Sequence, residues 1–338
     1  MPEAGSGSDG PQLDASVLVP VLDEEEHIGE VLVAVRGQRF AGTLELLFID
    51  GRSRDRTREI LEEAAAEDSR IRVLDNPGRR TPNALNVGLA AARGEYIVRM
   101  DAHTLYPDDY VARGVERVRR GDVAWAAGAA APHGVSHRSR QVALALGSKV
   151  GTGGSVFRHV SSGERDIPSG FAGVMHRGTL ERQGGWDEDW PINQDAELSA
   201  RIRKNEGRIV CLPVMTARYI PRNSFPSLAR QYLRYGHYRA KTTARHPETA
   251  RLSHLLPPAL VLTALAALAG PGVIRRPARG ALGVYAALLA AEGARIARAG
   301  AAQDALALPA IFATMHVAWG LGMLEGAARF GLRTFLRR

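Results

Sequence analysis

The chain has 338 residues, of which 45% are hydrophobic and 24% are charged, so it can bury a large core and exceeds the usual size of one domain. Its single cysteine, Cys211, excludes a disulfide framework within the chain and fits a reducing compartment. The formal net charge of +8 is compatible with a nucleic-acid or a membrane partner, so the location of the arginines has to decide between them.

The N-terminal residues 1–14 are rich in Gly, Ser, Pro and acidic residues and contain no apolar run, which predicts a disordered tail and not a signal peptide. Short apolar runs then predict four buried strands, at residues 15–22, 44–50, 71–74 and 94–100. Helical patterns lie between them, one through Val35, one that ends near Glu67 and one at residues 83–93. This alternation indicates βαβ units and a mostly parallel sheet, so the expected fold class is α/β.

Polar side chains follow all four predicted strands. They are Asp23 and Glu24 after the first strand, Asp50 at the end of the second, Arg79 and Arg80 after the third, and Asp101 and His103 after the fourth. In open α/β sheets the ligand lies beyond the carboxyl ends of the strands. We therefore expect these four segments to converge on one rim.

The tripeptide Asp101-Ala102-His103 directly follows the apolar run at residues 94–100. On a strand, residues i and i+2 point to the same face, so Asp101 and His103 could bind one divalent cation together. Alone, the tripeptide is more typical of a strand-end turn with solvated polar residues. With its polar neighbours it indicates a metal that holds a diphosphate. Imidazole tolerates manganese well, and magnesium stays open.

Several segments resemble the family-2 glycosyltransferases. Residues 19–25, 48–57, 83–88 and 93–97 are similar to the nucleotide-sugar half of that family, and residues 184–188 and 193–203 are similar to its acceptor half. The subgroup suggested is the succinoglycan-biosynthesis type, because Asp-Ala-His occurs together with Asn-Gln-Asp and with the stretch at residues 231–236. The resemblance covers about residues 15–250.

The resemblance implies a GT-A fold, a Rossmann-like sheet with flanking helices, over residues 15–225. A nucleotide diphosphate sugar would lie across the strand ends, bound by Pro20, Asp23, Glu24, Asp50, Arg79, Arg80 and Asp101. Asp50 would accept a hydrogen bond from the ring N–H of the base. One acid precedes Gly51 where the family usually has two, which makes the base less certain. The alternative is structural, with an acidic helix start at residues 23–26 and a capping residue at Asp50.

Asp195 matches the residue that deprotonates acceptors in the family. A sugar hydroxyl needs such a base at neutral pH. Asp195 follows Gln194 at the start of an amphipathic helix, so it could instead interact with the helix dipole. With one base and no covalent nucleophile evident, a single displacement with inversion is expected. Mn²⁺ or Mg²⁺ held by Asp101 and His103 would neutralise the leaving diphosphate.

Gln231, Arg234 and Tyr235 resemble the Gln-x-x-Arg-Trp motif of processive synthases, with tyrosine in place of tryptophan. They are implied, with Gln194, to contact the acceptor or the diphosphate. The alternative is an interfacial amphipathic helix with snorkelling arginines. Residues 226–252 are accordingly predicted to form a basic amphipathic interfacial segment.

Residues 253–338 are predicted to form a hydrophobic membrane region with two to three helical segments. Residues 255–273 lack charge and are long enough to cross a bilayer, and residues 306–324 lack charge apart from His316. Residues 281–291 are shorter and could span, lie in the interface or form a hairpin.

The basic residues between Arg218 and Arg251 suit anionic headgroups of the cytoplasmic leaflet. Three arginines at 275, 276 and 279 would lie outside if one simple span precedes them. The topology, multi-pass or hairpin-anchored, therefore stays open. The expected location is the cell membrane, with the catalytic domain on the cytoplasmic side.

The predicted function is a membrane-anchored, inverting, metal-dependent glycosyltransferase. It would move a sugar from a nucleotide diphosphate donor, with UDP preferred, to a hydroxyl of a lipid-linked or polysaccharide acceptor. The alternatives are a polyprenyl-phosphate glycosyltransferase, whose acceptor is already an anion, and an inactive GT-A-like membrane scaffold. A sugar nucleotidyltransferase would need a glycine-rich loop with lysine where residues 23–26 stand. The sequence has no motif typical of nucleic-acid binding.

Overall fold

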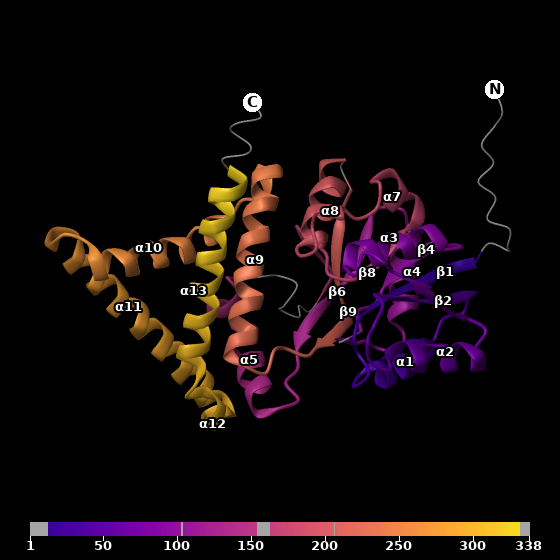
Figure 1. The fold of residues 1–338 in the computed structure, drawn as a ribbon, viewed down its shortest axis with the longest axis horizontal. Coiled ribbons are helices and arrows are strands. Elements are labelled where there is room, and N and C mark those ends of the chain that lie inside the picture. Colours follow the sequence, from indigo (N-terminus) through magenta and orange to yellow (C-terminus); the bar gives the residue numbers. More distant parts are fainter. Residues whose placement is uncertain (1–12, 103, 154–162, 206, 332–338) are drawn as a thin grey trace. The chain divides into compact units, whose positions relative to one another are not determined.

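The computed structural model describes residues 13–102, 104–153, 163–205 and 207–331. The chain divides into two compact units, one of residues 1–129 and 161–217 and the other of residues 130–160 and 218–338. Figure 1 traces the helices and strands of both.

The strands form one nine-stranded sheet within the described residues. Its order is β3 (Ile71–Asp75), β2 (Leu44–Asp50), β1 (Leu13–Val21), β4 (Gly94–Arg99), β8 (Gly173–His176), β6 (Trp125–Pro132), β9 (Ile209–Tyr219) and β5 (Thr104–Leu105), with β7 (Arg165–Asp166) paired to β9. The first four strands pair in parallel, whereas β8 is antiparallel to both β4 and β6. The α/β prediction is confirmed, and parallel pairing holds for the strands from which it was inferred.

The helices of the first unit are α1 (Ile28–Arg36), α2 (Thr57–Glu67), α3 (Thr81–Ala91), α4 (Tyr110–Arg119), α7 (Arg177–Arg182) and α8 (Gln194–Lys204). In Figure 1, α1 and α2 lie on one side of β1 and β2, and α3 lies on the other. Each of the first three helices connects two parallel strands, as the spacing of the apolar runs predicts. The strands predicted from those runs lie within two residues of the observed ones.

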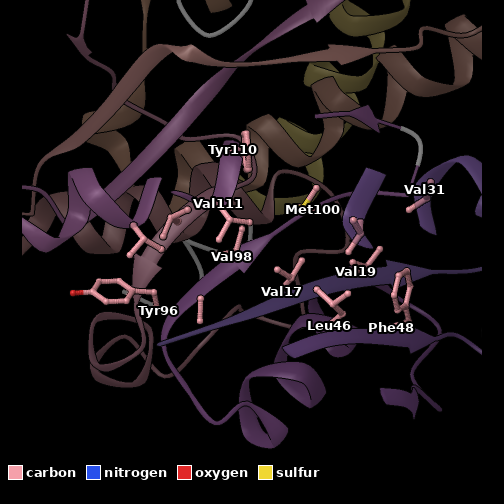
Figure 2. Packing of buried hydrophobic residues seen from close by; sticks show 14 of the residues in the cluster. Val17, Val19, Val31, Leu46, Phe48, Tyr96, Val98, Met100, Tyr110 and Val111 are labelled. Atoms are coloured by element: carbon pink, nitrogen blue, oxygen red, sulfur yellow. The ribbon is translucent and has the colours of Figure 1, made fainter. Parts of the chain in front are cut away.

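Alternation along β1 explains the main core. Ala15, Val17, Val19 and Val21 point to one face of the sheet, where they join a buried cluster with side chains of α1, α2 and α4. Figure 2 shows this face, with Val17 and Val19 beside residues of β2 and β4. Full burial of a valine or leucine stabilises the fold by about 1.5–3 kcal/mol. This packing holds the carboxyl ends of the strands in place.

The second unit is mostly helical. Its elements are α5 (His137–Gly147), α6 (Lys149–Thr152), α9 (Phe225–Arg245), the 3₁₀ turns Pro247–Thr249 and Leu252–His254, α10 (Leu256–Ala269), α11 (Gly272–Ile296), the π turn Ala297–Ala301, α12 (Ala302–Ala305), α13 (Leu308–Gly326) and the π turn Ala327–Gly331. Within the described residues, three helical stretches are long and apolar enough to cross a membrane, namely Leu252–Ala269, Gly272–Ala299 and Gln303–Gly331. Only 17% of the first two windows is buried, so most of their apolar side chains face outward, as in helices that contact lipid.

The sequence predicts one segment at residues 255–273, but the structure divides this apolar run between two helices. These are α10, which ends at Ala269, and α11, which begins at Gly272. Pro271 lies between them, and proline both lacks an N–H and disfavours helical geometry in the residue before it. The predicted short segment at residues 281–291 lies inside the much longer α11.

Glycines allow α9 and α13 to approach closely. A Cβ at Gly322 would clash with the backbone oxygen of Leu233, and a Cβ at Gly236 would clash with that of Trp319. Small residues at such contacts let helix backbones pack without intervening side chains, a common arrangement among membrane helices. The helices α9 and α13 therefore pack closely along each other.

A glycine in the sheet of the first unit provides a test of the strand packing. A Cβ at Gly128 of β6 would overlap the backbone oxygen of Met215 in β9. We therefore expect Gly128→Ala to lower the free energy of unfolding by about 1–3 kcal/mol, as overpacking typically does, and to lower the thermal unfolding midpoint accordingly. The matched control is Gly29→Ala in α1, where the added Cβ meets no atom within 4 Å. It should keep or slightly raise the midpoint, because alanine favours helix. Equal midpoints for Gly128→Ala and the parent protein would contradict this packing.

Candidate active site

The loops after β1 and β2 are joined by hydrogen bonds at the carboxyl edge of the sheet. The Asp23 carboxylate accepts a hydrogen bond from the Arg54 N–H at 2.7 Å, and the Asp23 N–H donates to Ser53 Oγ at 2.9 Å. Ser53 Oγ in turn donates to the Asp50 carboxylate at 2.6 Å. The structure therefore brings Asp23 and Asp50 together, as the shared edge of the strands predicts.

Asp50 is fully buried and organises the loop that follows it. Its carboxylate also accepts the Ser53 N–H, and Arg58 lies 3.6 Å away. Asp50 thus stabilises the loop and caps no helix, because the N-cap of α2 is Arg56. Contact of Asp50 with a nucleotide base stays a prediction. Glu24 is half-buried, and its N–H donates to Thr57 Oγ1 at 2.7 Å. Pro20 lies beyond the last β1–β4 pair, so its missing N–H breaks no bond of that ladder.

Arg79 connects the third strand end to the same rim. Its guanidinium donates to the Arg52 carbonyl at 2.7 Å and lies 4.0 Å from the Asp23 carboxylate. Arg52 in turn pairs with Asp75 at the end of β3. Arg80 is exposed and stands at the N-cap of α3. Arg79 is therefore fixed at the rim.

Backbone strain is concentrated around this edge and before α8. Among the described residues, Asp23, Arg52, Arg79 and Asn193 have φ values of 53°, 58°, 56° and 61°, and Ala172 is the fifth non-glycine residue with positive φ. Each such conformation costs on the order of 1–3 kcal/mol and is typical of functional sites. Three of the four belong to the rim, and the fourth lies two residues before Asp195.

Asp101 lies in a turn and not on a strand, because β4 ends at Arg99 and Thr104 N–H donates to the Asp101 carbonyl at 3.2 Å. Strand alternation therefore does not place Asp101 and His103 on one face, and that part of the sequence argument is wrong. The backbone N–H of Asp101 donates to the Tyr106 hydroxyl at 2.7 Å, which fixes the turn. His103 lies outside the described residues, so its predicted metal contact stays a prediction.

Arg99 bridges the two carboxylates that the sequence assigns to separate roles. Its Nε lies 2.8 Å from Asp101 Oδ1 and its Nη2 lies 3.2 Å from Oδ2, while Nη1 pairs with Asp195 Oδ1. The side chains of Arg99, Asp101 and Asp195 are only 4%, 9% and 16% exposed. One buried guanidinium thus holds the end of β4 to the first turn of α8, where Gln194 is also buried.

Burial raises the pKa of Asp195 to about 6. Arg99 acts in the opposite direction because its positive charge favours the carboxylate, and the negative charge of Asp101 raises the pKa further. A carboxyl group with a pKa near 6 is largely ionised at neutral pH, yet it holds a proton better than an ordinary aspartate. Such a value suits a general base.

Two motif segments a hundred residues apart meet beside α8. Asn86 of α3 accepts the Trp186 N–H at 2.9 Å and donates to the Trp186 carbonyl at 2.8 Å. Gly184 and Gly185 have φ values of 70° and 72°, which allow the tight turn before that contact. Arg201 of α8 donates to the Gly185 carbonyl at 2.9 Å. The structure thus joins the two halves of the resemblance.

Arg99 and Asn86 are the site residues whose roles the sequence argument missed. Arg99 stands in the apolar run before Asp101 and two residues from it, and a charge in a buried strand needs a partner. That signal could have singled it out. Nothing in the sequence alone indicates that its second partner is Asp195.

Gln231, Arg234 and Tyr235 belong to α9 in the second unit. The Gln231 amide donates to the hydroxyls of Tyr219 and Tyr235 at 3.1 and 3.0 Å, whereas Arg234 is exposed. Their predicted contact with acceptor or diphosphate stays a prediction.

The described residues contain no group of three or more His, Cys, Asp or Glu side chains that could bind a metal. Asp101 offers a carboxylate at the edge of the sheet. That is enough for Mg²⁺ in many nucleotide sites, where one or two carboxylates and the substrate phosphates share the ion. Both oxygens of Asp101 also contact Arg99, and the metal contact of Asp101 stays a prediction.

Comparison with known proteins agrees with this architecture. Residues 16–168 match the family described as Glycosyl transferase family 2. The chain is 33% identical to the succinoglycan biosynthesis protein ExoA of Rhizobium meliloti (strain 1021), over 90% of this chain and 92% of that protein. It is 23% identical, over 65% of this chain and 71% of the other, to a dolichyl N-acetyl-alpha-D-glucosaminyl phosphate 3-beta-D-2,3-diacetamido-2,3-dideoxy-beta-D-glucuronosyltransferase of Methanococcus voltae.

Among solved structures, the chain resembles the mannosyltransferase PcManGT of Pyrobaculum calidifontis in complex with GDP-Man and Mn²⁺. The TM-score is 0.60 at 22% identity, over 96% of this chain and 90% of the other, which shows the fold. The fold is thus that of a GT-A glycosyltransferase. The chain belongs to glycosyl transferase family 2.

The raised pKa of Asp195 predicts the pH dependence of the reaction. If Asp195 must be ionised to accept a proton, kcat/KM should fall as the pH decreases through about 6. Transfer rates measured between pH 4.5 and 8.5, with donor binding measured at each pH as a control, check this. A constant kcat/KM down to pH 5 would contradict the assignment.

Proposed function

We propose that this protein is a membrane-anchored inverting glycosyltransferase that uses a UDP-linked sugar and a divalent metal. Its acceptor is a hydroxyl of a lipid-linked or polysaccharide sugar. The observation that carries the proposal is the buried Arg99 bridge between Asp101 and Asp195. The names of the relatives support a role in polysaccharide or lipid-linked sugar synthesis, since one acts in succinoglycan biosynthesis and another is named for a dolichyl phosphate-linked sugar.

Asp195 is the general base of the proposed reaction. Its pKa of about 6 lets it accept the acceptor hydroxyl proton while the oxygen attacks the donor sugar. Attack from the face opposite the leaving diphosphate inverts the anomeric centre. A polyprenyl phosphate acceptor would need no such base, so the environment of Asp195 favours a sugar hydroxyl.

The donor would lie along the rim formed by the first four strands. Asp23, Glu24 and Asp50 would face the nucleoside, and Arg79 and Arg80 would reach the phosphates. Asp101 would hold the divalent ion, which neutralises charge on the leaving diphosphate when bound. Arg99 positions both Asp101 and Asp195 through its two ion pairs.

Membrane anchoring is proposed from the three helical stretches that could cross a bilayer. The basic residues that precede the first of them suit the cytoplasmic leaflet. A cytoplasmic catalytic unit would have access to nucleotide sugars made in the cytoplasm.

Two variants separate donor binding from transfer. Asp195→Asn should reduce kcat by about 10²–10⁴-fold, the usual contribution of a general base, and keep nucleotide binding. Asp101→Ala should abolish the increase in nucleotide affinity that metal provides. Binding of UDP and GDP to the detergent-solubilised chain, with Mn²⁺, Mg²⁺ or chelator, and transfer to a lipid-linked sugar measure both effects.

Glu181→Gln serves as the control, because the Glu181 side chain is 60% exposed on α7 and its carboxylate lies 3.6 Å from Arg177. It should change neither binding nor transfer. Normal turnover by Asp195→Asn would remove Asp195 as the base. If neither nucleotide bound under any metal condition, the transferase proposal would fail and an inactive scaffold would be the better account.

A further inference from the structure

The second unit has a large excess of positive charge. Residues 130–160 and 218–338 contain 21 Lys and Arg but only four Asp and Glu. Each of these four acids already has a partner: Glu248 pairs with His246, Glu292 with Arg295, Asp304 with His137 and Glu325 with His237. The unit therefore carries 17 more basic than acidic side chains.

Arg239 of α9 is the most unusual of these cations. It is half-buried, and burial together with the charge of Arg251 lowers its pKa to about 10. None of the four acids of the unit, all described, forms an ion pair with it. A guanidinium that has lost part of its hydration beside another cation is unfavourable unless an anion compensates it.

Unpartnered polar groups lie at the same place. The positive charges of Arg239 and Arg251 both act on the imidazole of His254. His254 Nδ1 is buried without a hydrogen-bond partner among the described residues. The hydroxyl of Thr243, one helical turn after Arg239, is also buried without a hydrogen-bond partner among them. The His254 ring packs against Trp319 of α13 at 5.8 Å. The two arginines thus act on one imidazole, and an unpartnered hydroxyl lies one helical turn from Arg239.

The location of this cluster indicates where its ligand comes from. Arg251 and His254 stand at the start of Leu252–Ala269, the first stretch that could cross a membrane. Charged side chains at the end of a spanning helix lie at the depth of lipid headgroups. Guanidinium groups bind phosphate by parallel hydrogen bonds, and a hydroxyl and an imidazole can add others.

We propose that Arg239, Arg251, His254 and Thr243 form a binding site for the phosphate group of a membrane lipid. The inference rests on the proposed membrane anchoring and specifies one lipid contact of it. Two lipids present this chemistry, an anionic phospholipid and a polyprenyl phosphate that carries an acceptor sugar. Either would place a negative charge beside Arg239.

The test uses the detergent-solubilised full chain and four soluble probes: a short-chain polyprenyl phosphate, dioctanoyl phosphatidylglycerol, dioctanoyl phosphatidylcholine and inorganic phosphate. We expect one of the two anionic lipids to bind at least tenfold more tightly than phosphatidylcholine or inorganic phosphate. The preferred lipid identifies the source of the phosphate. Equal affinity for phosphatidylcholine and the anionic lipids, or tight binding of inorganic phosphate alone, would overturn the proposal.

Arg239→Gln and Arg251→Gln should each weaken the preferred lipid by about 10- to 100-fold, the usual effect of losing a charge-assisted hydrogen bond. Arg230→Gln is the matched control, because Arg230 is exposed on the same helix. The unfolding midpoint of Arg239→Gln in lipid-free detergent should not fall, because Arg239 forms no ion pair with the four acids of its unit. Unchanged lipid affinity in both variants would contradict the site.

UDP binding in the same preparations distinguishes the two proposals. Arg239→Gln and Arg251→Gln should keep the nucleotide affinity of the parent chain. If UDP failed to bind the parent chain while the lipid phosphate bound as expected, the catalytic proposal would fail and the lipid site would stand.

Discussion

The buried guanidinium of Arg99 is the interaction on which the geometry of the proposed catalytic site depends. It lies between Asp101 and Asp195, so three charges share a site from which water is largely excluded. Removal of one partner of a buried ion pair typically costs 3–5 kcal/mol, because the other charge is left uncompensated. The bridge therefore fixes the turn after β4 relative to the first turn of α8. It also moderates the effect of burial on Asp195, whose pKa would otherwise be higher.

The rest of the first unit supports this bridge. Alternating apolar residues of β1, β2 and β4 pack against α1, α2 and α4, which aligns the carboxyl ends of the parallel strands. Asp23, Ser53 and Asp50 join the first two strand ends by hydrogen bonds. The surrounding hydrogen bonds hold the backbone at this edge in its strained conformation, so the strain is tolerated. These hydrogen bonds connect the strand ends at which the proposed donor site lies.

Local patterns predicted the first four strands and the helices between them, because strand alternation and helical periodicity are properties of short segments. The strands β5 to β9 and the helices α4 and α7 were not predicted. The run at residues 44–50 corresponds to β2, and Asp50 at its end lies at the expected edge. Contacts between distant segments were beyond this reasoning, since no local pattern pairs Arg99 with Asp195 or Asn86 with Trp186. The hydropathy of residues 255–273 predicted one helical segment, because hydropathy does not take account of the helix-breaking effect of Pro271. In the structure this run is divided between two helices.

The most direct test of the central claim is the pH dependence of kcat/KM in two variants of Arg99. Arg99→Lys keeps the positive charge beside Asp195, whereas Arg99→Gln removes it, and UDP binding identifies variants that remain folded. The account predicts that the acidic limb stays near pH 6 in Arg99→Lys and moves to higher pH in Arg99→Gln. An acidic limb at the same pH in Arg99→Gln and the parent protein would show that Arg99 does not control the proposed base.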